Sequence, residues 1–502
     1  MQNLIPAFFL ILTLLSLGCT RPNQAALSND QGEVPAPAVD AQNYVPQNAI
    51  APVDNAANSA VQADAPTTTE HVVLLGETLS TIARQYGVDL FSLMDHNEID
   101  DGNLLLPGQV LTIPVDKPAE NETPVTRPSA NLEIISDHEL VYGLDARDFD
   151  IQRFLQSYDG YLLTLEEEVE GHMLTGPEIV QLLADRYSIN PKLLLAVLEY
   201  DAGALTAASP PDDNYILGHE QEGAEGLYRQ LSWAANLLNW GFYGRADGGA
   251  SSFLMGDSQV DFAPEISDGT AGVQNYLGGR DGITYNQWLR DAGPDGFAAL
   301  YRDLFGASAV DAGTPLLPDE LYSPALLLPW ESGETWHLSS GPHGGWNTGS
   351  AWAALDFVPS DIEYGCVPSE SWVTAVAGGI VTRSGLGAVV LDLDGDGYAG
   401  SGWAVTYMHL DDNQRIAAGT TVAPGDRLGH PGCEGGFSNG THLHLARTYN
   451  GRWISADGDI PFNLSGWISG GEGYEYNGWL LRDGVIKTAD IYKTDDNAIT
   501  AD

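Results

Sequence analysis

The sequence predicts a multidomain α+β protein with a small β-α-α-β module, an all-helical middle domain and a C-terminal domain built on an antiparallel β-sheet. Three observations support this prediction. Segments poor in large apolar residues flank residues 70–115, apolar residues recur at helical spacing within residues 135–312, and short β-type runs rich in glycine fill residues 313–494. A chain of 502 residues also exceeds what one hydrophobic core usually holds.

The charge of the chain disfavours two kinds of partner. Asp and Glu number 69 against 21 Lys and Arg, which gives a net charge of −48. So acidic a surface disfavours nucleic acid as a partner and electrostatic docking on anionic lipid. We interpret the acidity as an aid to solubility or salt tolerance.

The first residues predict export. Leu4 to Leu17 form an apolar run of signal-peptide size, so we assign residues 1–18 to a signal peptide. The run ends in Ser16-Leu17-Gly18-Cys19, which resembles a bacterial lipoprotein box, although Leu is more usual in place of Ser16 and no Lys or Arg precedes the run. The resemblance implies a lipid on Cys19 and a cell-envelope location. Otherwise Cys19 is cleaved away or stays in an uncleaved anchor, and the mature protein is extracellular.

Residues 19–69 read as a disordered tether, because Ala, Pro, Asn, Gln and Asp dominate and cannot bury enough surface to fold. Residues 70–115 differ. A β-type run at His71-Val72-Val73 precedes a helix capped by Thr78, and a short helix near 89–97 precedes a strand at 110–114.

This module resembles LysM over nearly its whole length. The matching residues are Gly76-Glu77-Thr78-Leu79, Ile82-Ala83, Tyr86-Gly87-Val88, Asn97 and Pro107-Gly108-Gln109. The resemblance implies binding of N-acetylglucosamine-containing glycan, here peptidoglycan, in a groove near Gly76, Glu77, Thr78, Leu79 and Ile99. The alternative is a folded spacer that binds nothing.

After a Pro/Glu/Thr-rich linker, residues 116–134, the chain reads as helical to residue 312. Ile179, Leu182 and Leu183 have helical spacing, Asn190-Pro191 starts a helix to Tyr200, and further helices are expected at 227–240 and 297–305. The stretch 177–203 is faintly similar to the catalytic opening of lytic transglycosylases, but Asp201-Ala202 replaces their Glu-Ser. We therefore favour a scaffold or wall-contact domain over one that uses Glu199 or Asp201 as a general acid.

The segment Gly440-Thr441-His442-Leu443-His444 carries the main chemical signal. Side chains two residues apart in a strand face the same way, so His442 and His444 would stand together. Imidazole is a common zinc ligand, and the attacking water needs a nearby base, so the pair can supply one ligand and one base. Taken alone, the pair also fits two partly exposed histidines on an edge strand.

Residues upstream favour the metal interpretation. His343, Asp356 and His444 would form a set of two imidazoles and one carboxylate with a fourth position open to water, as catalytic zinc requires. His409 lies in the same glycine-rich β region.

Five blocks in this region, in their order along the chain, resemble the lysostaphin-like (LytM-type) zinc metallopeptidases, which cut peptide cross-links in bacterial peptidoglycan. The blocks are Leu355-Asp356-Phe357, Val373-Thr374-Ala375-Val376-Ala377-Gly378-Gly379-Ile380-Val381, Tyr407-Met408-His409-Leu410, Gly425-Asp426-Arg427-Leu428-Gly429 and Gly440-Thr441-His442-Leu443-His444. The resemblance implies a duplicated-hybrid-motif fold, zinc ligands at His343, Asp356 and His444, a base at His442, and a histidine at His409 that helps to hold the water or the developing oxyanion.

One departure concerns the first ligand. The family's first histidine and aspartate usually lie closer together, whereas twelve residues, Gly344 to Leu355, separate them here. His337 is the nearby competitor. We favour His343, because Gly341-Pro342-His343-Gly344-Gly345 can bring the backbone close to a metal and the following residues can bulge out as a loop.

Two further features remain in this domain. Once Cys19 is lipidated or removed, Cys366 and Cys433 are left as a candidate disulfide in an oxidising compartment, the alternatives being two free thiols or Cys433 as a metal ligand. Asp392, Asp394 and Asp396 alternate as in the first half of a calcium loop, but Trp403 replaces the closing Glu, which favours a polar hairpin turn between 389–391 and 403–405.

We therefore predict a zinc-dependent endopeptidase that hydrolyses amide bonds in peptidoglycan stem or cross-bridge peptides and is targeted to the wall by LysM. Residues 313–494 form the metallopeptidase domain, and 495–502 a tail. The alternative function is a non-catalytic wall-binding scaffold or an activator of another peptidoglycan hydrolase. An enzyme needs the three candidate ligands, His343, Asp356 and His444, together with His442 and His409. All five residues are present, which favours the enzyme over the scaffold.

Overall fold

A computed structural model describes residues 68–72, 82, 93, 97, 110–114 and 125–502, without 213, 222, 257, 309, 311, 312, 437 and 439. All of the described residues belong to the unit Pro66–Asp502. The predicted signal peptide, Cys19 and the predicted glycan-binding residues Gly76 to Leu79 and Ile99 lie outside the described residues.

The described part of the N-terminal module is a pair of strands. β1, Thr68–Val72, pairs antiparallel with β2, Val110–Pro114. Asn97 joins Leu93 to β2, because its side-chain nitrogen donates to Leu93 O and Thr112 O while its oxygen accepts from Thr112 N. The sequence predicts a strand at each end of this module, and the two observed strands pair with each other.

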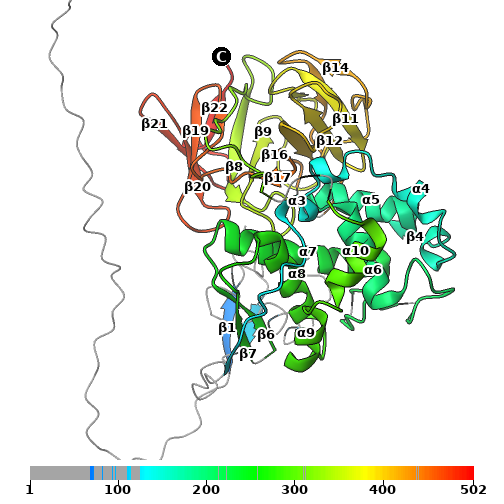
Figure 1. The fold of residues 1–502 in the computed structure, drawn as a ribbon. Coiled ribbons are helices and arrows are strands. Elements are labelled where there is room, and N and C mark those ends of the chain that lie inside the picture. The colour runs from blue at the N-terminus through cyan, green and yellow to red at the C-terminus, as the bar shows by residue number, and fades with distance from the viewer. Residues whose placement is uncertain are drawn as a thin grey trace, which may run out of the picture. The chain divides into compact units, whose positions relative to one another are not determined.

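The middle region is mainly helical, as predicted, and Figure 1 shows its helices gathered together. Its helices are α3 Asp137–Leu140, α4 Ile151–Leu155, α5 Gly176–Tyr187, α6 Pro191–Ala202, α7 Leu227–Ala246, α8 Asp268–Gly279, α9 Tyr285–Asp291 and α10 Phe297–Phe305, with 3-10 turns η1 Leu144–Ala146 and η2 Tyr161–Leu163. The predicted helices near 179–183, 191–200, 227–240 and 297–305 are confirmed.

Local sequence explains where two of these helices begin. Thr175 and Glu178 form a capping box at the start of α5, followed by a Pro in the first turn. The side chain of Asn190 accepts from Lys192 N at the start of α6, and Pro191 occupies the first helical position.

Short strands accompany the helices, which the prediction of an all-helical region did not include. They are β3 Val125–Arg127, β4 Glu166–Val169, β5 His172–Thr175, β6 Ser252–Met255 and β7 Ser258–Asp261. β4 pairs with β5, and β7 lies between β6 and β3. Strands of three or four residues give too short an alternation to be recognised in a sequence.

Among the described residues, nine strands of the C-terminal region form one antiparallel sheet in the order β14-β11-β12-β13-β16-β9-β8-β22, with β17 paired to β16 (Figure 1). The bounds are β8 Thr335–His343, β9 Ala354–Pro359, β11 Gly379–Gly385, β12 Ala388–Asp392, β13 Trp403–Met408, β14 Thr421–Val422, β16 Leu443–Tyr449, β17 Arg452–Trp453 and β22 Ala498–Thr500. The predicted antiparallel β-sheet domain is confirmed.

Smaller sheets flank the large one. β10 Val373–Thr374 pairs with β15 Arg427–Gly429, and β18 Asn463–Leu464, β19 Trp467–Gly471, β20 Gly478–Arg482 and β21 Val485–Thr488 form a four-stranded sheet. The last residues, predicted as a tail, contribute β22 to the large sheet, because Ile499 is buried against the core.

Two hydrophobic cores support the site. One lies within the sheet domain and includes Leu443 and Leu445 of β16. The other fills the middle region and extends to Ala353, Ala446 and Trp453 of the sheet domain, so the two regions share packed apolar surface. Within the described part of the chain, no helix combines the length and apolar character needed to cross a membrane.

Candidate metal centre

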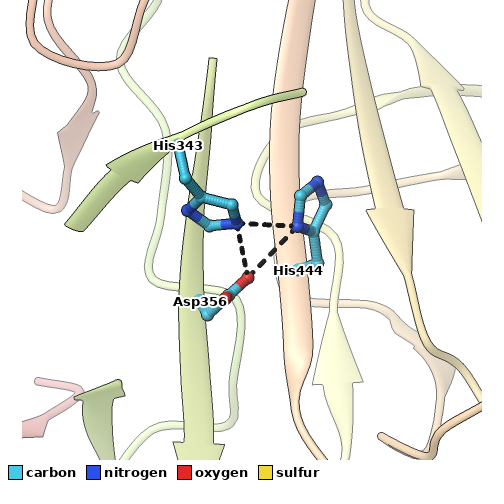
Figure 2. Close-up of side chains that lie close together, drawn as sticks. All are labelled: His343, Asp356 and His444. Carbon is cyan, nitrogen blue, oxygen red and sulfur yellow. Dashed lines mark hydrogen bonds and ion pairs between the residues drawn. The ribbon is translucent and has the colours of Figure 1, made fainter. Parts of the chain in front are cut away.

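Three adjacent strands bring the predicted ligands together. β16 pairs with β9 so that His444 lies directly opposite Asp356, and cross-strand partners project from the same face of a sheet. β9 pairs in turn with β8, where irregular register after Ser340 carries His343 to the same place. Figure 2 shows the two rings and the carboxylate pointing at one another.

The candidate ligand atoms of His343, Asp356 and His444, which we call the metal set, lie in mutual contact. Asp356 Oδ1 is 3.2 Å from His343 Nε2 and 3.2 Å from His444 Nδ1, and these two nitrogens are 3.1 Å apart. All three residues are buried, with exposures of 5% for His343, 7% for Asp356 and 9% for His444. The set can offer three ligand atoms to one metal ion.

Hydrogen bonds to the backbone determine which nitrogen of each ring faces the centre. His343 Nδ1 lies 2.8 Å from Gly341 O, and His444 Nε2 lies 3.1 Å from Gly345 O. A carbonyl oxygen only accepts, so each of these nitrogens carries the proton. The neutral rings therefore present lone pairs at His343 Nε2 and His444 Nδ1, the two atoms nearest Asp356.

A metal cation fits this arrangement. Three atoms with lone pairs face one another, and Asp356 Oδ1 makes no well-directed hydrogen bond although imidazole nitrogens surround it. Acceptors packed this closely repel one another unless a positive charge lies between them. Two imidazoles and a carboxylate are ligands that zinc takes in catalytic sites, and the backbone carbonyls hold the rings as second partners of metal-bound histidines do.

Burial and the neighbouring charges shift the pKa of each group in this site. Burial lowers the pKa of His343, but Asp356 outweighs burial and raises this pKa above its usual value. Burial would raise the pKa of Asp356, yet His343 and His442 hold it well below its usual value. Burial also lowers the pKa of His444. The carboxylate therefore stays ionised, and the centre attracts positive charge.

His442 and His409 lie beside the metal set. His442 Nδ1 is 2.7 Å from Gly440 O and its Nε2 is 3.8 Å from Asp356 Oδ1, so a lone pair on Nε2 faces the centre. His409 Nδ1 is 2.9 Å from Glu434 O, and its ring lies 4.5 Å from that of His442. Burial holds the pKa of His409 well below its usual value, so the ring is neutral.

The backbone at His409 is in an unusual conformation. This residue follows the last residue of β13 and has φ +64°, in the left-handed region that residues with a side chain seldom adopt. Such conformations cluster at functional sites, where the surrounding structure holds them in place.

His337, the competitor for first ligand, lies elsewhere. Its ring nitrogens contact Asn497 Oδ1 at 3.0 Å and Ser360 Oγ at 3.1 Å. Residues 344–353, which connect β8 to β9 and which we call the connecting segment, form a loop that lets His343 reach the centre despite its distance from Asp356 in sequence.

A disulfide closes the loops around the site. Cys366 and Cys433 are bonded, linking the loop after β9 to the loop before β16. Thr441 strengthens the link, since its hydroxyl donates to Val367 O and accepts from Val367 N. The predicted pair is thus brought together, and Cys433 is no metal ligand in this structure.

The acidic segment forms the predicted hairpin turn. β12 and β13 pair with Asp392 opposite Ala404, and the turn between them carries Asp394 and Asp396. The three carboxylates could also offer oxygens to one ion. However, each accepts hydrogen bonds from backbone nitrogens of the same turn.

The two carboxylates of the middle region serve its structure. Glu199 accepts from Leu205 N and Thr206 Oγ1 just beyond the end of α6. Asp201 pairs with Arg280 at 2.6 Å and also accepts from Tyr276. These bonds support the scaffold interpretation of this region.

Sequence reasoning missed several neighbours of the metal set. Tyr476, in the turn between β19 and β20, stacks on His343 with ring centroids 4.8 Å apart. The carbonyls of Gly341 and Gly345 orient the rings of His343 and His444. The glycines of this block were the available signal, whereas nothing in the sequence connects Tyr476 to a histidine 133 positions earlier.

Comparison with known families defines the class of protein. Residues 71–114 match the LysM domain, residues 362–456 match peptidase family M23, and residues 133–317 match the N-terminal domain of LasA. The M23 match includes His409, His442 and His444 and begins after His343 and Asp356. The chain thus carries a LysM domain, a helical middle region and an M23 peptidase domain.

Individual relatives narrow this class. Protease LasA of Pseudomonas aeruginosa is 28% identical over 349 residues, which cover 64% of this chain and 75% of that protein. Protease LasA of a second strain is 27% identical over the same length and the same shares. Among solved structures, the deep-sea M23 metalloprotease pseudoalterin is 29% identical and covers 33% of this chain and 95% of that one, with a TM-score of 0.28. The chain is thus similar to protease LasA over 349 residues.

Proposed function

We propose that this protein is a zinc-dependent endopeptidase that hydrolyses amide bonds in the stem or cross-bridge peptides of peptidoglycan. One observation carries the proposal: three buried acceptor atoms, from His343, Asp356 and His444, face one another and need a cation between them. The M23 match and the homology to a protease support peptide hydrolysis, and the LysM match supports a peptidoglycan substrate.

Zinc bound by these three residues would polarise the scissile carbonyl and lower the pKa of the attacking water. His442 is the base: its Nε2 lone pair faces the centre, and its Nδ1–H donates to Gly440 O, which holds this tautomer. Once protonated, His442 can return the proton to the leaving amine.

His409 helps to hold the reacting water and then the oxyanion. In the neutral ring Nδ1–H donates to Glu434 O, so Nε2 accepts a hydrogen bond from water. As negative charge develops, the second proton of the attacking water can pass to Nε2, and His409 then donates a hydrogen bond toward the oxygen that becomes negative. The hydrogen bond to Glu434 O also holds the ring in place.

We further propose that the LysM module targets the enzyme to the wall, with Gly76 to Leu79 and Ile99 forming its glycan groove. The chain lacking residues 71–114 should lose binding to insoluble peptidoglycan while it keeps zinc and hydrolysis of a soluble peptide. Equal sedimentation of both chains with peptidoglycan would contradict this role.

Export to the cell envelope, with a lipid on Cys19, completes the proposal. Cys19→Ala should move the protein from the membrane fraction to the soluble fraction. An unchanged membrane fraction would contradict lipidation of this residue.

The central test pairs zinc content with product analysis. Purified protein should contain one zinc per chain, and mass spectrometry of a peptidoglycan digest should show new peptide termini with intact glycan. Removal of zinc by a chelator should abolish both results until zinc is restored. Protein that binds no zinc and releases no peptide would contradict the proposal and favour the scaffold alternative.

A further inference from the structure

His444 is oriented by a carbonyl of the connecting segment. Its Nδ1 faces Asp356, and its Nε2–H donates to Gly345 O at 3.1 Å. Such a bond fixes both the tautomer and the direction of the ring of a metal-ligating histidine, and loss of this kind of partner typically weakens metal binding 10- to 100-fold. The position of Gly345 therefore bears directly on the metal centre.

The connecting segment is held partly by its own turn. Gly345 N donates to Ala351 O at 3.0 Å, and Trp346 N donates to Ser350 Oγ at 3.0 Å. Gly345 has no room for a side chain, since a Cβ would lie 2.7 Å from the ring of Trp453. The segment is thus compact, so a shift of the segment would also move Gly345 O.

Helices of the middle region hold the outer end of the same segment. Asn236 of α7 accepts from Gly349 N at 2.8 Å, and its amide nitrogen lies 3.3 Å from Thr348 Oγ1. Asn347 donates to Tyr187 Oη, at the end of α5, at 3.0 Å. These contacts join residues more than 110 positions apart in the chain.

The Trp346 ring adds cation–π and aromatic contacts between the connecting segment and α5. It lies under the guanidinium of Arg186, whose carbon is 4.7 Å from the ring centroid, and meets Tyr187 edge to face at 6.3 Å. Arg186 is itself fixed by Glu170, at 2.7 Å. A buried cation over an aromatic face is a directional contact, so the segment is held against rotation as well as translation.

We propose that the middle region is a positioning element of the metal centre: Asn236 and Tyr187 hold the connecting segment, which through Gly345 O orients His444. This inference rests on the proposed role of His444 as a zinc ligand. The proposal gives the middle region a function that its fold alone does not suggest. Its helices carry no catalytic group, but they hold the segment whose carbonyl contacts His444.

The test uses the full chain and measures the metal, apart from activity. Asn236→Ala combined with Tyr187→Phe removes the hydrogen bonds to the segment with little change of shape. Competition with a chromophoric chelator should show a zinc affinity reduced about 10-fold, the lower end for such partners. The visible absorption bands of the cobalt-loaded protein, which report ligand geometry, should shift or broaden.

Two further variants separate positioning from general loss of stability. Asn275→Ala removes a comparable amide bond, to Leu237 O at 2.7 Å, which joins α8 to α7 and does not involve the connecting segment, and should leave zinc affinity and the cobalt spectrum unchanged. Asn236→Asp keeps the acceptor for Gly349 N and should restore most of the affinity.

Each outcome decides the inference. Unchanged affinity and an unchanged spectrum in the double variant, with wild type binding zinc, would overturn the positioning role while leaving the proposed function intact. An equal loss in Asn275→Ala would also overturn it, because the effect would then be general. Wild-type protein that binds no zinc would contradict the proposed function itself.

Discussion

In the described part of the chain, two clusters of side chains could offer ligand atoms to a metal ion, and they differ in how their oxygens are satisfied. At His343, Asp356 and His444 the hydrogen-bond donors point outward to backbone carbonyls, so that lone pairs face inward. In the acidic turn, backbone nitrogens donate to Asp392, Asp394 and Asp396 from within the same few residues.

Burial and partners reinforce the difference. Asp356 is buried among imidazoles, whereas Asp396 is exposed to solvent and pairs with Arg147 at 2.7 Å. A carboxylate that already accepts from backbone and arginine gains little from a cation, but one without a well-directed donor gains much. Proximity of acidic groups is therefore a weaker indication of a metal site than the direction of the donors around them.

The largest expected effect comes from breaking the first cluster. Asp356→Ala and His444→Ala should each lose zinc and, with it, peptide cleavage, because water cannot replace a protein ligand without weakening the site. Zinc per chain and cleavage of a peptide measured together test this. His337→Ala is the matched control, since this histidine lies outside the set. Full zinc content in either ligand variant would contradict the assignment.

The disulfide beside the first cluster should have the next largest effect. Replacing Cys366 and Cys433 by Ser opens a loop of 67 residues, and the chain-entropy model gives a loss of about 4 kcal/mol in the free energy of unfolding. Denaturant unfolding monitored by Trp fluorescence measures the loss. A change below about 1 kcal/mol would mean that strand pairing alone holds these loops.

Removing the base should have a smaller and more selective effect. His442→Ala should keep most of its zinc while turnover falls roughly 100-fold, about 2.7 kcal/mol in the activation barrier. His409→Ala should behave in the same way. The measurement is turnover of zinc-loaded protein, with zinc content as the internal control. A His442→Ala variant as active as wild type would contradict its catalytic role.

The second cluster should show the smallest effect. Asp394→Asn keeps the oxygen that accepts from Asp396 N, so zinc content, activity and thermal stability should stay at wild-type values. Calcium should not raise the melting temperature of either protein. If calcium did bind, a calcium concentration 100 times the dissociation constant would add about 2.7 kcal/mol to the free energy of unfolding. A rise in melting temperature in wild type that the variant lacks would therefore contradict our comparison.

Local patterns in the sequence determined much of the fold and the residue types of the site. Helical spacing and N-caps located α5, α6, α7 and α10, and strand alternation put His442 and His444 on one face. These features depend on a few neighbouring residues, so they can be recognised in the chain alone.

Tertiary structure decided what depends on distant partners. The glycines around His343 favour it over His337, but only strand pairing places it beside Asp356 and sets Asp356 opposite His444. Only the folded backbone brings the carbonyl of Gly345 to His444. Side-chain periodicity is a local property. Strand register, carbonyl directions and the contacts between the middle region and the connecting segment instead involve residues about a hundred positions apart. No spacing in the sequence encodes them.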